Sequence, residues 1–429
     1  MRRRQALVAA ALAPWMQRAR AIDPARLTAG RLTADFEPLA AVWMGHDAGH
    51  AAFTAALAAA LGPFVPLKLL VRDAEAEAAA RALLAEGAPA VERVQFVHDA
   101  AAPFFMRDAA VFAHDGQGRA ALVDLRWSHY GWARWCAQRH GKGSAEARSC
   151  ASAEAGPIDA LEERLAERLG AALFRSPLAM EGGGVEVNGQ GLLIANQELW
   201  LGRNPTLDRA AIERELLRLP GVRRVIWLPQ GLAHDPLHRA TITGRHVAWG
   251  TGGHTDQFVR FADERTVLLA WPEPDQAARH PVARLNLQRM RRNAEVLAAA
   301  TDLRGRRLRV LRVPLPHVVE RPVELNPEAD TRLARGWTPE SFAARERRRA
   351  GDTLLHVAST SWLNFVVAND VLVLPDYQAH GSPPALQARA ERVLAQAFPG
   401  RQLRTVDAMG ANWVGGGAHC ATLGEPRSV

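Results

Sequence analysis

The run Gly415-Gly416-Gly417-Ala418-His419-Cys420 ends nine residues before the last residue of a chain of 429 residues. Three consecutive Gly allow the backbone to approach a ligand closely, and a thiol directly after them could act as a nucleophile. The other two Cys, Cys136 and Cys150, lie far upstream. Alone, the run fits a glycine-rich turn with a buried Cys equally well.

A second glycine turn, Gly252-Gly253-His254-Thr255-Asp256, supplies an imidazole and a carboxylate two positions apart. If this segment is extended, side-chain alternation places His254 and Asp256 on one face, where both can act in one site. Together with Cys420 they provide a nucleophile, a base and a carboxylate, which favours a hydrolase with a cysteine nucleophile. A metal site would need further His or Cys at ligand spacing, which the sequence does not show, so we predict neither a metal nor an organic cofactor.

Two more segments place carboxylates beside turns. Phe104-Phe105-Met106-Arg107-Asp108 sets an ion pair next to aromatic residues, and a purely structural Arg–Asp pair is the alternative. Glu181-Gly182-Gly183-Gly184 sets a carboxylate at the edge of a glycine turn, where a plain hairpin is the alternative. Asp108, Glu181 and His254 follow one another at intervals of 73 residues, each at a turn after an apolar run. This weak period suggests a ring of similar units that place their turns at one centre.

The rest of the chain alternates strand-like and helix-like runs without a convincing linker, which predicts an α/β fold. The strand-like runs are residues 121–125, 192–195, 225–228, 266–270, 308–313 and 365–374. The helix-like runs are residues 51–61, 74–86, 158–169, 207–219, 286–300 and 384–397, with Thr206 as a possible cap of the fourth.

Several carboxylates around one thiol suit a cationic substrate. A planar guanidinium offers five N–H donors in a fork that carboxylates match in pairs. Two carboxylates would hold and polarise the group, so that its central carbon becomes electrophilic towards a thiolate. A nearby His can then protonate the departing ammonia and later activate water. The residues therefore fit guanidine hydrolysis better than peptide hydrolysis, which needs oxyanion donors and little negative charge.

At this point the chain resembles the agmatine deiminase and bacterial-type peptidyl-arginine deiminase family, whose members modify guanidino groups and share the pentein fold. Matching stretches run in family order over nearly all of residues 22–429. Beside the four segments above they are Asp35-Phe36-Glu37-Pro38, Val42-Trp43-Met44, Leu201-Gly202-Arg203-Asn204-Pro205, Val225-Ile226-Trp227-Leu228-Pro229-Gln230-Gly231-Leu232, Ser361-Trp362-Leu363-Asn364-Phe365 and Phe398-Pro399-Gly400-Arg401. The resemblance implies a single catalytic domain at 22–429, built as a five-bladed α/β propeller with pseudo-fivefold symmetry.

The resemblance also implies roles for individual residues. Cys420 matches the nucleophile, His254 the general acid/base, and Glu181 the acid that supports His254. The substrate-binding residues are expected to be Asp108, Asp256, Arg107, Asn364 and Gly417. His419, beside the nucleophile, is expected to be structural, because adjacent residues on an extended chain point apart.

The implied activity is that of a hydrolase acting on C–N bonds in linear amidines, which converts a guanidine to the ureido product and ammonia through a covalent Cys thiouronium. Agmatine, a step towards putrescine, is one substrate that the resemblance implies, but the sequence departs from the agmatine deiminase pattern at four places. Gly250 stands where an acid is expected and Phe105 where a Trp is expected, while Ala110-Val111 replace Gly-Pro and Gly184 replaces Asn. Free or peptidyl arginine therefore stays open beside agmatine. A secreted, non-catalytic guanidine-binding protein is the alternative, and a homodimer is possible.

The N-terminus resembles an export signal. Arg2-Arg3-Arg4 precede a short apolar run, and Ala19-Arg20-Ala21 has the form of a cleavage site. We therefore predict a signal peptide at 1–21, loosely of twin-arginine type, and a periplasmic or extracellular protein. Its removal would take away five Arg and no acid, lowering the formal charge from +8 to +3.

The remaining charge and Cys residues bear on partners and compartment. The Arg clusters at 304–307 and 345–349 lack interleaved aromatic residues, which favours solvated faces over nucleic-acid binding. No stretch is long enough to span a membrane. In an oxidising compartment Cys136 and Cys150 could pair across an Arg-rich loop and leave Cys420 free, and three free thiols are the equal alternative.

Overall fold

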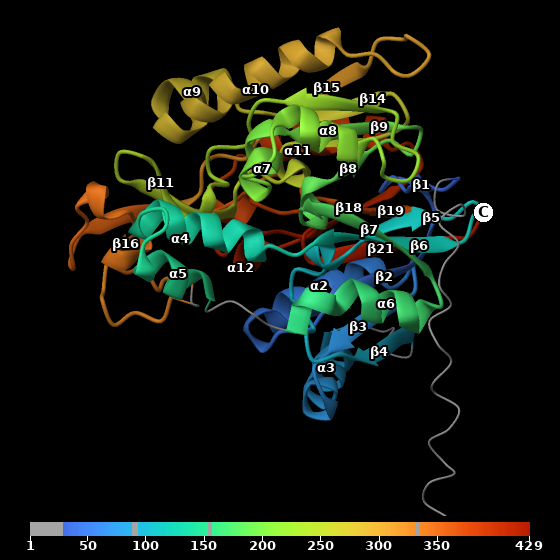
Figure 1. Ribbon diagram of the computed structural model, residues 1–429, viewed down its shortest axis with the longest axis horizontal. Coiled ribbons are helices and arrows are strands. Elements are labelled where there is room, and N and C mark those ends of the chain that lie inside the picture. Colours follow the sequence, from blue (N-terminus) through green and yellow to red (C-terminus); the bar gives the residue numbers. More distant parts are fainter. Residues whose placement is uncertain (1–28, 88–92, 153–156, 332–333) are drawn as a thin grey trace, which may run out of the picture.

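The computed structural model describes residues 29–429 except 88–92, 153–156 and 332–333, and it is a mixed α/β fold (Figure 1). The predicted signal peptide at 1–21 lies outside the described residues. Within the described part, no helix combines the length and the apolar character needed to cross a membrane.

One three-stranded pattern recurs five times in the described chain. In each unit the first two strands pair antiparallel, and a third strand pairs parallel to the second after a helical connection. The units are β5 (Val111–His114), β6 (Ala120–Arg126) and β7 (Ala172–Ala179); β8 (Glu186–Val187), β9 (Leu192–Asn196) and β10 (Arg224–Leu228); β13 (Val259–Phe261), β14 (Thr266–Trp271) and β15 (Arg309–Pro314); β18 (Val366–Ala368), β19 (Val371–Pro375) and β20 (Gln402–Val406); and β21 (Thr422–Pro426), β2 (Leu39–Gly45) and β3 (Leu67–Val71).

Two short strands extend these sheets. The strand β1 (Arg31–Leu32) pairs with β5, and β4 (Val94–His98) pairs with β3. The fifth unit joins the two ends of the described chain, because β21 pairs with β2.

The connecting helices lie around the strands (Figure 1). They are α2 (Ala51–Leu61), α6 (Leu161–Leu169), α7 (Gln197–Arg203), α8 (Arg209–Leu216), α9 (Pro274–Arg279), α10 (Pro281–Ala299) and α11 (Pro384–Ala397), while α3 (Ala74–Gly87) connects β3 to β4. The predicted bounds of α2 and α11 are confirmed.

Three helix starts differ from the sequence prediction, and one of them is α6, which begins at Leu161 after a 3-10 turn at Pro157–Ala160 instead of at 158. The first residue of α10 is Pro281, five positions before the predicted start, because Pro fits the first helical turn and His280 caps it. The cap of α8 is Asp208, whose side chain accepts the Ala211 N–H at 2.7 Å, and Thr206 lies outside the helix.

The predicted single strand at 365–374 is in fact a hairpin. Asn369 has a φ of 50°, a left-handed conformation that Asn tolerates, and it turns the chain between β18 and β19. The polar pair Asn369-Asp370 interrupts the apolar run and is the local signal for this turn, while the strands on either side are buried on both faces.

A sixth sheet lies outside the five units. Its strand order is β11 (Leu237–Thr243), β12 (His246–Thr251), β17 (Thr353–Val357) and β16 (Glu320–Glu324). It packs over its own small apolar core, in which Trp337 and Phe342 stack with 5.7 Å between ring centroids.

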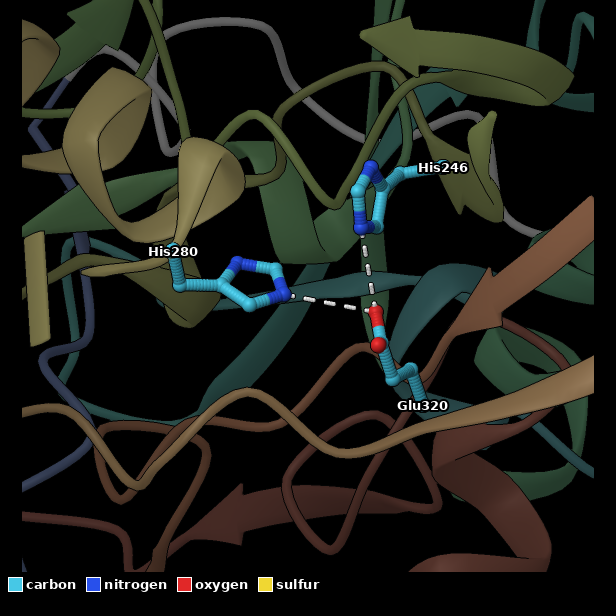
Figure 2. Close-up of side chains that lie close together, drawn as sticks. All are labelled: His246, His280 and Glu320. Carbon is cyan, nitrogen blue, oxygen red and sulfur yellow. Dashed lines mark hydrogen bonds and ion pairs between the residues drawn. The ribbon is translucent and has the colours of Figure 1, made fainter. Parts of the chain in front are cut away.

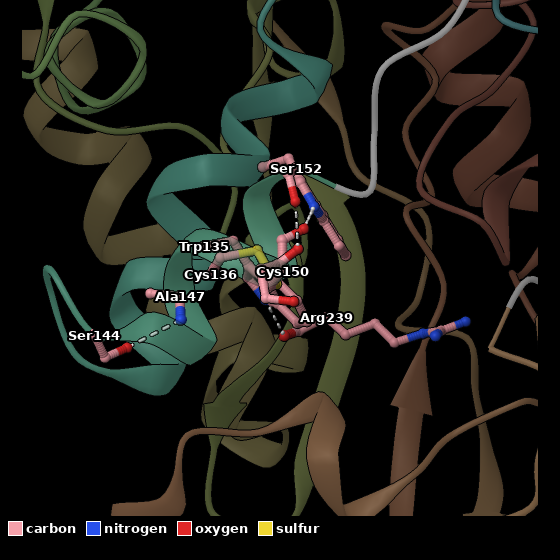
Figure 3. The surroundings of a disulfide bond; sticks show 9 residues. Trp135, Cys136, Ser144, Ala147, Cys150, Ser152 and Arg239 are labelled. Atoms are coloured by element: carbon pink, nitrogen blue, oxygen red, sulfur yellow. Dashed lines mark hydrogen bonds between the residues drawn. A yellow bond between two sulfur atoms is a disulfide. The ribbon is translucent and has the colours of Figure 1, made fainter.

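The predicted Arg-rich loop around the two upstream Cys is helical instead. It contains α4 (Trp132–His140) and α5 (Ala145–Ala151), joined by the Cys136–Cys150 disulfide with 5.8 Å between the Cα atoms (Figure 3). The predicted pairing is thus confirmed, and Cys420 is free. Trp135 fastens α4 to β11 by donating to the Arg239 carbonyl at 3.3 Å. We call residues 127–151 the stapled segment.

Candidate active site

The loops that precede the first strands of the five units carry the predicted site residues. Three of these loops contain short 3-10 helices, η3 (Met106–Ala109), η7 (Gly182–Gly184) and η8 (Thr255–Gln257). In chain order the loops bring Asp108, Glu181, the pair His254 and Asp256, Asn364, and Cys420. The interval of 73 residues therefore reflects the same loop in three consecutive units, although Glu181 and His254 directly precede their 3-10 helices and Asp108 lies inside η3.

The Cys420 thiol is enclosed by polar side chains. It is 2 % exposed, and its Sγ lies 3.2 Å from Asn364 Nδ2 and 3.4 Å from Asp256 Oδ2. Asn364 is itself fixed, because its Oδ1 accepts the His419 backbone N–H at 2.9 Å. Burial raises the pKa of the thiol well above its usual value, and the negative charges of Asp256 and Asp108 raise it further. The unliganded site therefore holds a protonated thiol.

Gly417 makes the approach of Asn364 possible. A Cβ at this position would lie 2.4 Å from Asn364 Oδ1, closer than any real contact. The glycine run before Cys420 thus lets Asn364 reach the backbone of the nucleophile loop.

His254 lies between two carboxylates. Its Nε2 is 3.2 Å from Glu181 Oε2, and its Nδ1 is 3.7 Å from Asp108 Oδ1. Burial alone would lower the pKa of this imidazole, but Asp108, Glu181 and Asp256 together raise it to about 9. At neutral pH the ring is consequently an imidazolium, and its buried Nδ1 has no hydrogen-bond partner among the described residues.

Glu181 is the fixed anchor of the imidazole. The Arg203 Nε lies 2.9 Å from both of its oxygens, and the Ser128 hydroxyl donates to it at 3.1 Å. Burial would raise the pKa of Glu181, but Arg203 and His254 outweigh this and lower it to about 2. Sequence reasoning gave Arg203 no role, although the Leu201-Gly202-Arg203-Asn204-Pro205 stretch was a signal that pointed to it.

Asp108 accepts two hydrogen bonds. The Gly183 N–H donates to Oδ1 at 3.0 Å, and the Tyr130 hydroxyl donates to Oδ2 at 2.9 Å. Burial raises the pKa of Asp108 to about 6, with His254 opposing this and Asp256 adding to it. Tyr130 comes from the stapled segment, and it has a left-handed φ of 55° between His129 at 48° and Gly131 at 74°. Such strain at a functional group indicates a conformation that its surroundings enforce.

Asp256 connects the thiol to a second imidazole. Its Oδ2 is 2.8 Å from His419 Nδ1, and His419 Nε2 is 2.8 Å from Asp35 Oδ2. A neutral imidazole donates at one nitrogen only, so the second carboxylate requires a further proton on the ring or on a carboxyl group. The other oxygen of Asp256, Oδ1, is buried without a partner among the described residues.

The backbone at His254 and at His419 is not extended, contrary to expectation, although the predicted residues do come together. His254 precedes the 3-10 turn η8, so it and Asp256 do not alternate along an extended strand. His419 and Cys420 lie in a turn, not on an extended chain, and both contact the same Asp256 oxygen. His419 is therefore joined to the site through a carboxylate, and the prediction that it points away is corrected.

Arg107 differs from the other predicted residues. Its guanidinium pairs with Asp35 at 3.1 Å, while its backbone N–H donates to the Cys420 carbonyl at 3.0 Å. Arg260 pairs with the same carboxylate at 2.9 Å. These contacts place the Arg107 side chain behind the nucleophile loop, and they give no support to its predicted role in substrate binding.

Two of the departures from the agmatine pattern, Gly250 and Phe105, can be located in the structure. A Cβ at Gly250 would lie 2.4 Å from Asp235 Oδ1, so Asp235 fills the place next to it. Asp235 accepts the N–H groups of Gly253 and His254 at 3.1 and 2.9 Å and thereby holds the His254 turn. Phe105 packs against Gly416, where a Cβ would lie 2.1 Å from its ring.

Comparison with known proteins places this chain in a family. The model of the Porphyromonas-type peptidyl-arginine deiminase family matches residues 31–426. The chain belongs to this family. A protein of Streptomyces coelicolor named "Putative agmatine deiminase" is 31 % identical over 417 residues, which cover 93 % of this chain and 99 % of the relative. The resemblance found in the sequence is thereby confirmed, and the deiminases are hydrolases that act on C–N bonds.

Solved structures of deiminases share the fold. The agmatine deiminase of Enterococcus faecalis superimposes with a TM-score of 0.67 at 22 % identity, covering 94 % of this chain and 97 % of that chain. The C. jejuni agmatine deiminase with substrate bound has a TM-score of 0.63 at 16 % identity, covering 93 % and 97 %.

Proposed function

We propose that this protein hydrolyses a guanidine to the corresponding urea and ammonia through a covalent thiouronium on Cys420. The observation that carries the proposal is a buried thiol 3.4 Å from the Asp256 carboxylate, with Asp108 close enough for its charge to raise the pKa of the thiol and with the His254 imidazolium 3.7 Å from Asp108. The family supports guanidino-group chemistry in general.

A guanidinium fits the buried polar atoms that face the thiol. Among the described residues, Asp256 Oδ1 and Gln257 Oε1 are buried acceptors without a donor. Asp108 can accept a further donor at each oxygen, since a carboxylate oxygen has two acceptor positions. A cation bound here offsets the two negative charges that raise the pKa of the Cys420 thiol. Substrate binding thus favours the thiolate, and the proton leaves by way of Asp256 Oδ2 at 3.4 Å.

The covalent step uses the imidazolium as an acid. The thiolate sulfur bonds to the guanidinium carbon, and the C–N bond to the leaving nitrogen breaks as His254 Nδ1 gives it a proton. Ammonia departs and a thiouronium remains on Cys420. The neutral His254 then removes a proton from water, whose oxygen attacks the same carbon. As the C–S bond breaks, the hydroxyl proton of the adduct passes to the leaving sulfur, which restores the Cys420 thiol, and the ureido product leaves.

Purified protein incubated with agmatine, free arginine and an arginyl peptide tests the proposal. We expect ammonia and a ureido product in equal amounts from one of the three, with none from Cys420→Ala. Mass spectrometry of acid-quenched reactions should show an adduct on the Cys420 peptide. Binding without turnover, unchanged in Cys420→Ala, would instead support the non-catalytic binding protein.

We further propose that the five units close around this site as the blades of a propeller, and that the protein is exported. The five equivalent loops that meet at the thiol support the first proposal. The disulfide supports the second, since such bonds persist in oxidising compartments. Mass spectrometry of the protein from a periplasmic fraction tests the export proposal, because a chain cleaved after residue 21 is lighter than the full chain by the mass of those 21 residues.

A further inference from the structure

A cluster of two His and one Glu lies outside the residues described above (Figure 2). His246 begins β12, His280 caps α10, and Glu320 begins β16. The Nε2 atoms of both His residues lie 3.3 Å from the same atom, Glu320 Oε2. All three candidate ligand atoms lie within 4.8 Å of one another.

The proton positions leave an unsatisfied contact in this cluster. His246 Nδ1 is 3.2 Å from the Thr243 carbonyl, which can only accept, so this nitrogen carries the proton. In a neutral ring Nε2 is then a lone pair that faces a carboxylate oxygen with no hydrogen between them. Either a proton on Nε2 or a metal cation between the two atoms removes this repulsion. An Nδ1–H bonded to a carbonyl is also the arrangement that orients metal-binding His residues.

Two of the three separations between the ligand atoms fit a tetrahedral metal ion, and the third, between the two His nitrogens, lies within 4.8 Å. Zinc bonds to imidazole nitrogen and carboxylate oxygen of about 2.0–2.1 Å place neighbouring ligand atoms about 3.3 Å apart. This is the separation of both His nitrogens from Glu320 Oε2. The side chains of His246, His280 and Glu320 are 13, 22 and 29 % exposed, so water can reach the fourth position.

We propose that His246, His280 and Glu320 bind a divalent zinc ion that joins β12, the start of α10 and β16. Two imidazoles with one carboxylate and an open position are a ligand set that suits zinc. The ion would fix the strand that leads from His246 to the His254 turn. This proposal does not depend on the deiminase activity. No ligand spacing in the sequence predicts this zinc site, because the three ligands are 34 and 40 positions apart.

One contact opposes the ion and limits its affinity. His280 Nδ1 accepts the Val282 N–H at 3.2 Å, so the ring proton lies on Nε2 and points to Glu320. Zinc needs a lone pair at Nε2, so the proton must move to Nδ1 and the hydrogen bond to Val282 is lost. Zinc binding should therefore change the amide signal and hydrogen exchange of Val282.

Zinc titration of the full chain tests the proposal. Protein purified without a polyhistidine tag is stripped with a chelator, desalted and titrated with zinc chloride by calorimetry. Thermal unfolding is followed with and without zinc. We expect one zinc per chain, an increase in Tm, and at least tenfold weaker binding in His246→Gln and in Glu320→Gln. Cobalt(II) as a second probe should give the strong visible absorption of a tetrahedral site.

Two control variants separate the alternatives. His98→Gln removes an exposed imidazole that pairs with Glu77 at 2.5 Å without a second His, and it should bind zinc like the wild type. Cys420→Ser should also bind normally. Equal zinc binding by the wild type and by His246→Gln would overturn the proposal. The three side chains would then be held together by shared protons alone. Loss of binding in Cys420→Ser would assign the zinc to the thiol instead. Circular dichroism confirms that each variant is folded.

Discussion

Replacing Asp256 by Asn should make the Cys420 thiol more acidic and the enzyme slower at the same time. The Asp256 Oδ2 atom lies 3.4 Å from Sγ, and its charge helps to raise the pKa of the thiol. The same carboxylate offers its free Oδ1 to the substrate. One substitution therefore acts in opposite directions on the nucleophile and on the binding of a cation.

The distances set the size of both effects. Two charges about 4 Å apart interact by about 4 kcal/mol at an effective dielectric constant of about 20. A tenfold change in thiolate fraction needs only about 1.4 kcal/mol, so the thiolate fraction at a given pH should rise at least tenfold. Loss of a charge-assisted hydrogen bond to the guanidinium costs about 1.5–3 kcal/mol, which lowers kcat/KM by about 10- to 150-fold.

Two measurements separate these effects. The ultraviolet absorbance of the thiolate, titrated against pH with Cys420→Ser as the blank, reports the nucleophile without needing reagent access to a buried thiol. Initial rates of ammonia release report turnover. Asp263→Asn is the matched control, because Asp263 accepts backbone N–H groups in a turn away from the site. A thiol that titrates as in the wild type, or undiminished turnover in folded Asp256→Asn, would refute the reasoning.

Three further predictions concern other parts of the site. Asp108, with a pKa of about 6, must be ionised to bind a cation, so kcat/KM should fall as pH drops through about 6. Tyr130→Phe removes a donor to that carboxylate and should move this limb to higher pH, and an unmoved limb in the pH profile would contradict the assignment. The folded-state pKa of His254, about 9, exceeds its usual 6.5, so its contribution to stability is complete below pH 6.5 and is lost as pH rises through 9. The difference in unfolding free energy between wild type and His254→Gln should accordingly shrink by about 3 kcal/mol across that range in denaturant titrations. Replacing both Cys residues of the stapled segment by Ser should lower the unfolding free energy by about 2–4 kcal/mol, and reductant should lower that of the wild type equally while leaving the variant unchanged.

Local sequence predicts the α/β class, the strands β6, β9, β10, β14 and β15, and the segments that carry the thiol, the imidazole and the carboxylates, but most of the 21 strands in the described part of the chain were not predicted. Glycine turns at 181–184, 252–256 and 415–420 mark places where the backbone must come close to other groups, and such turns can be recognised without a structure. The hairpin turn at Asn369 and the early start of α10 at Pro281 were missed, although the polar pair Asn369-Asp370 is a local turn signal and Pro281 is typical of a first helical turn.

The partners of the site residues could not be predicted, for a different reason. Asp35 contacts His419 across 384 positions, and Arg203 contacts Glu181 from the last turn of α7, 22 positions away. The stretches that contain Asp35 and Arg203 match the family, but neither stretch tells which residue its side chain contacts.

These hidden partners decide the chemistry more than the visible residues do. Without Arg203 the buried Glu181 carboxylate would keep Ser128 and His254 as partners, and its pKa would lie above its value of about 2. A weaker negative charge at Glu181 would in turn lower the pKa of the His254 imidazole from about 9. In the proposed mechanism His254 gives a proton to the leaving nitrogen, and that proton is maintained in part by the arginine that pairs with Glu181. A glycine motif can reveal where a site lies, but the protonation state of the site is set by charges packed behind it, and only the folded chain brings these together.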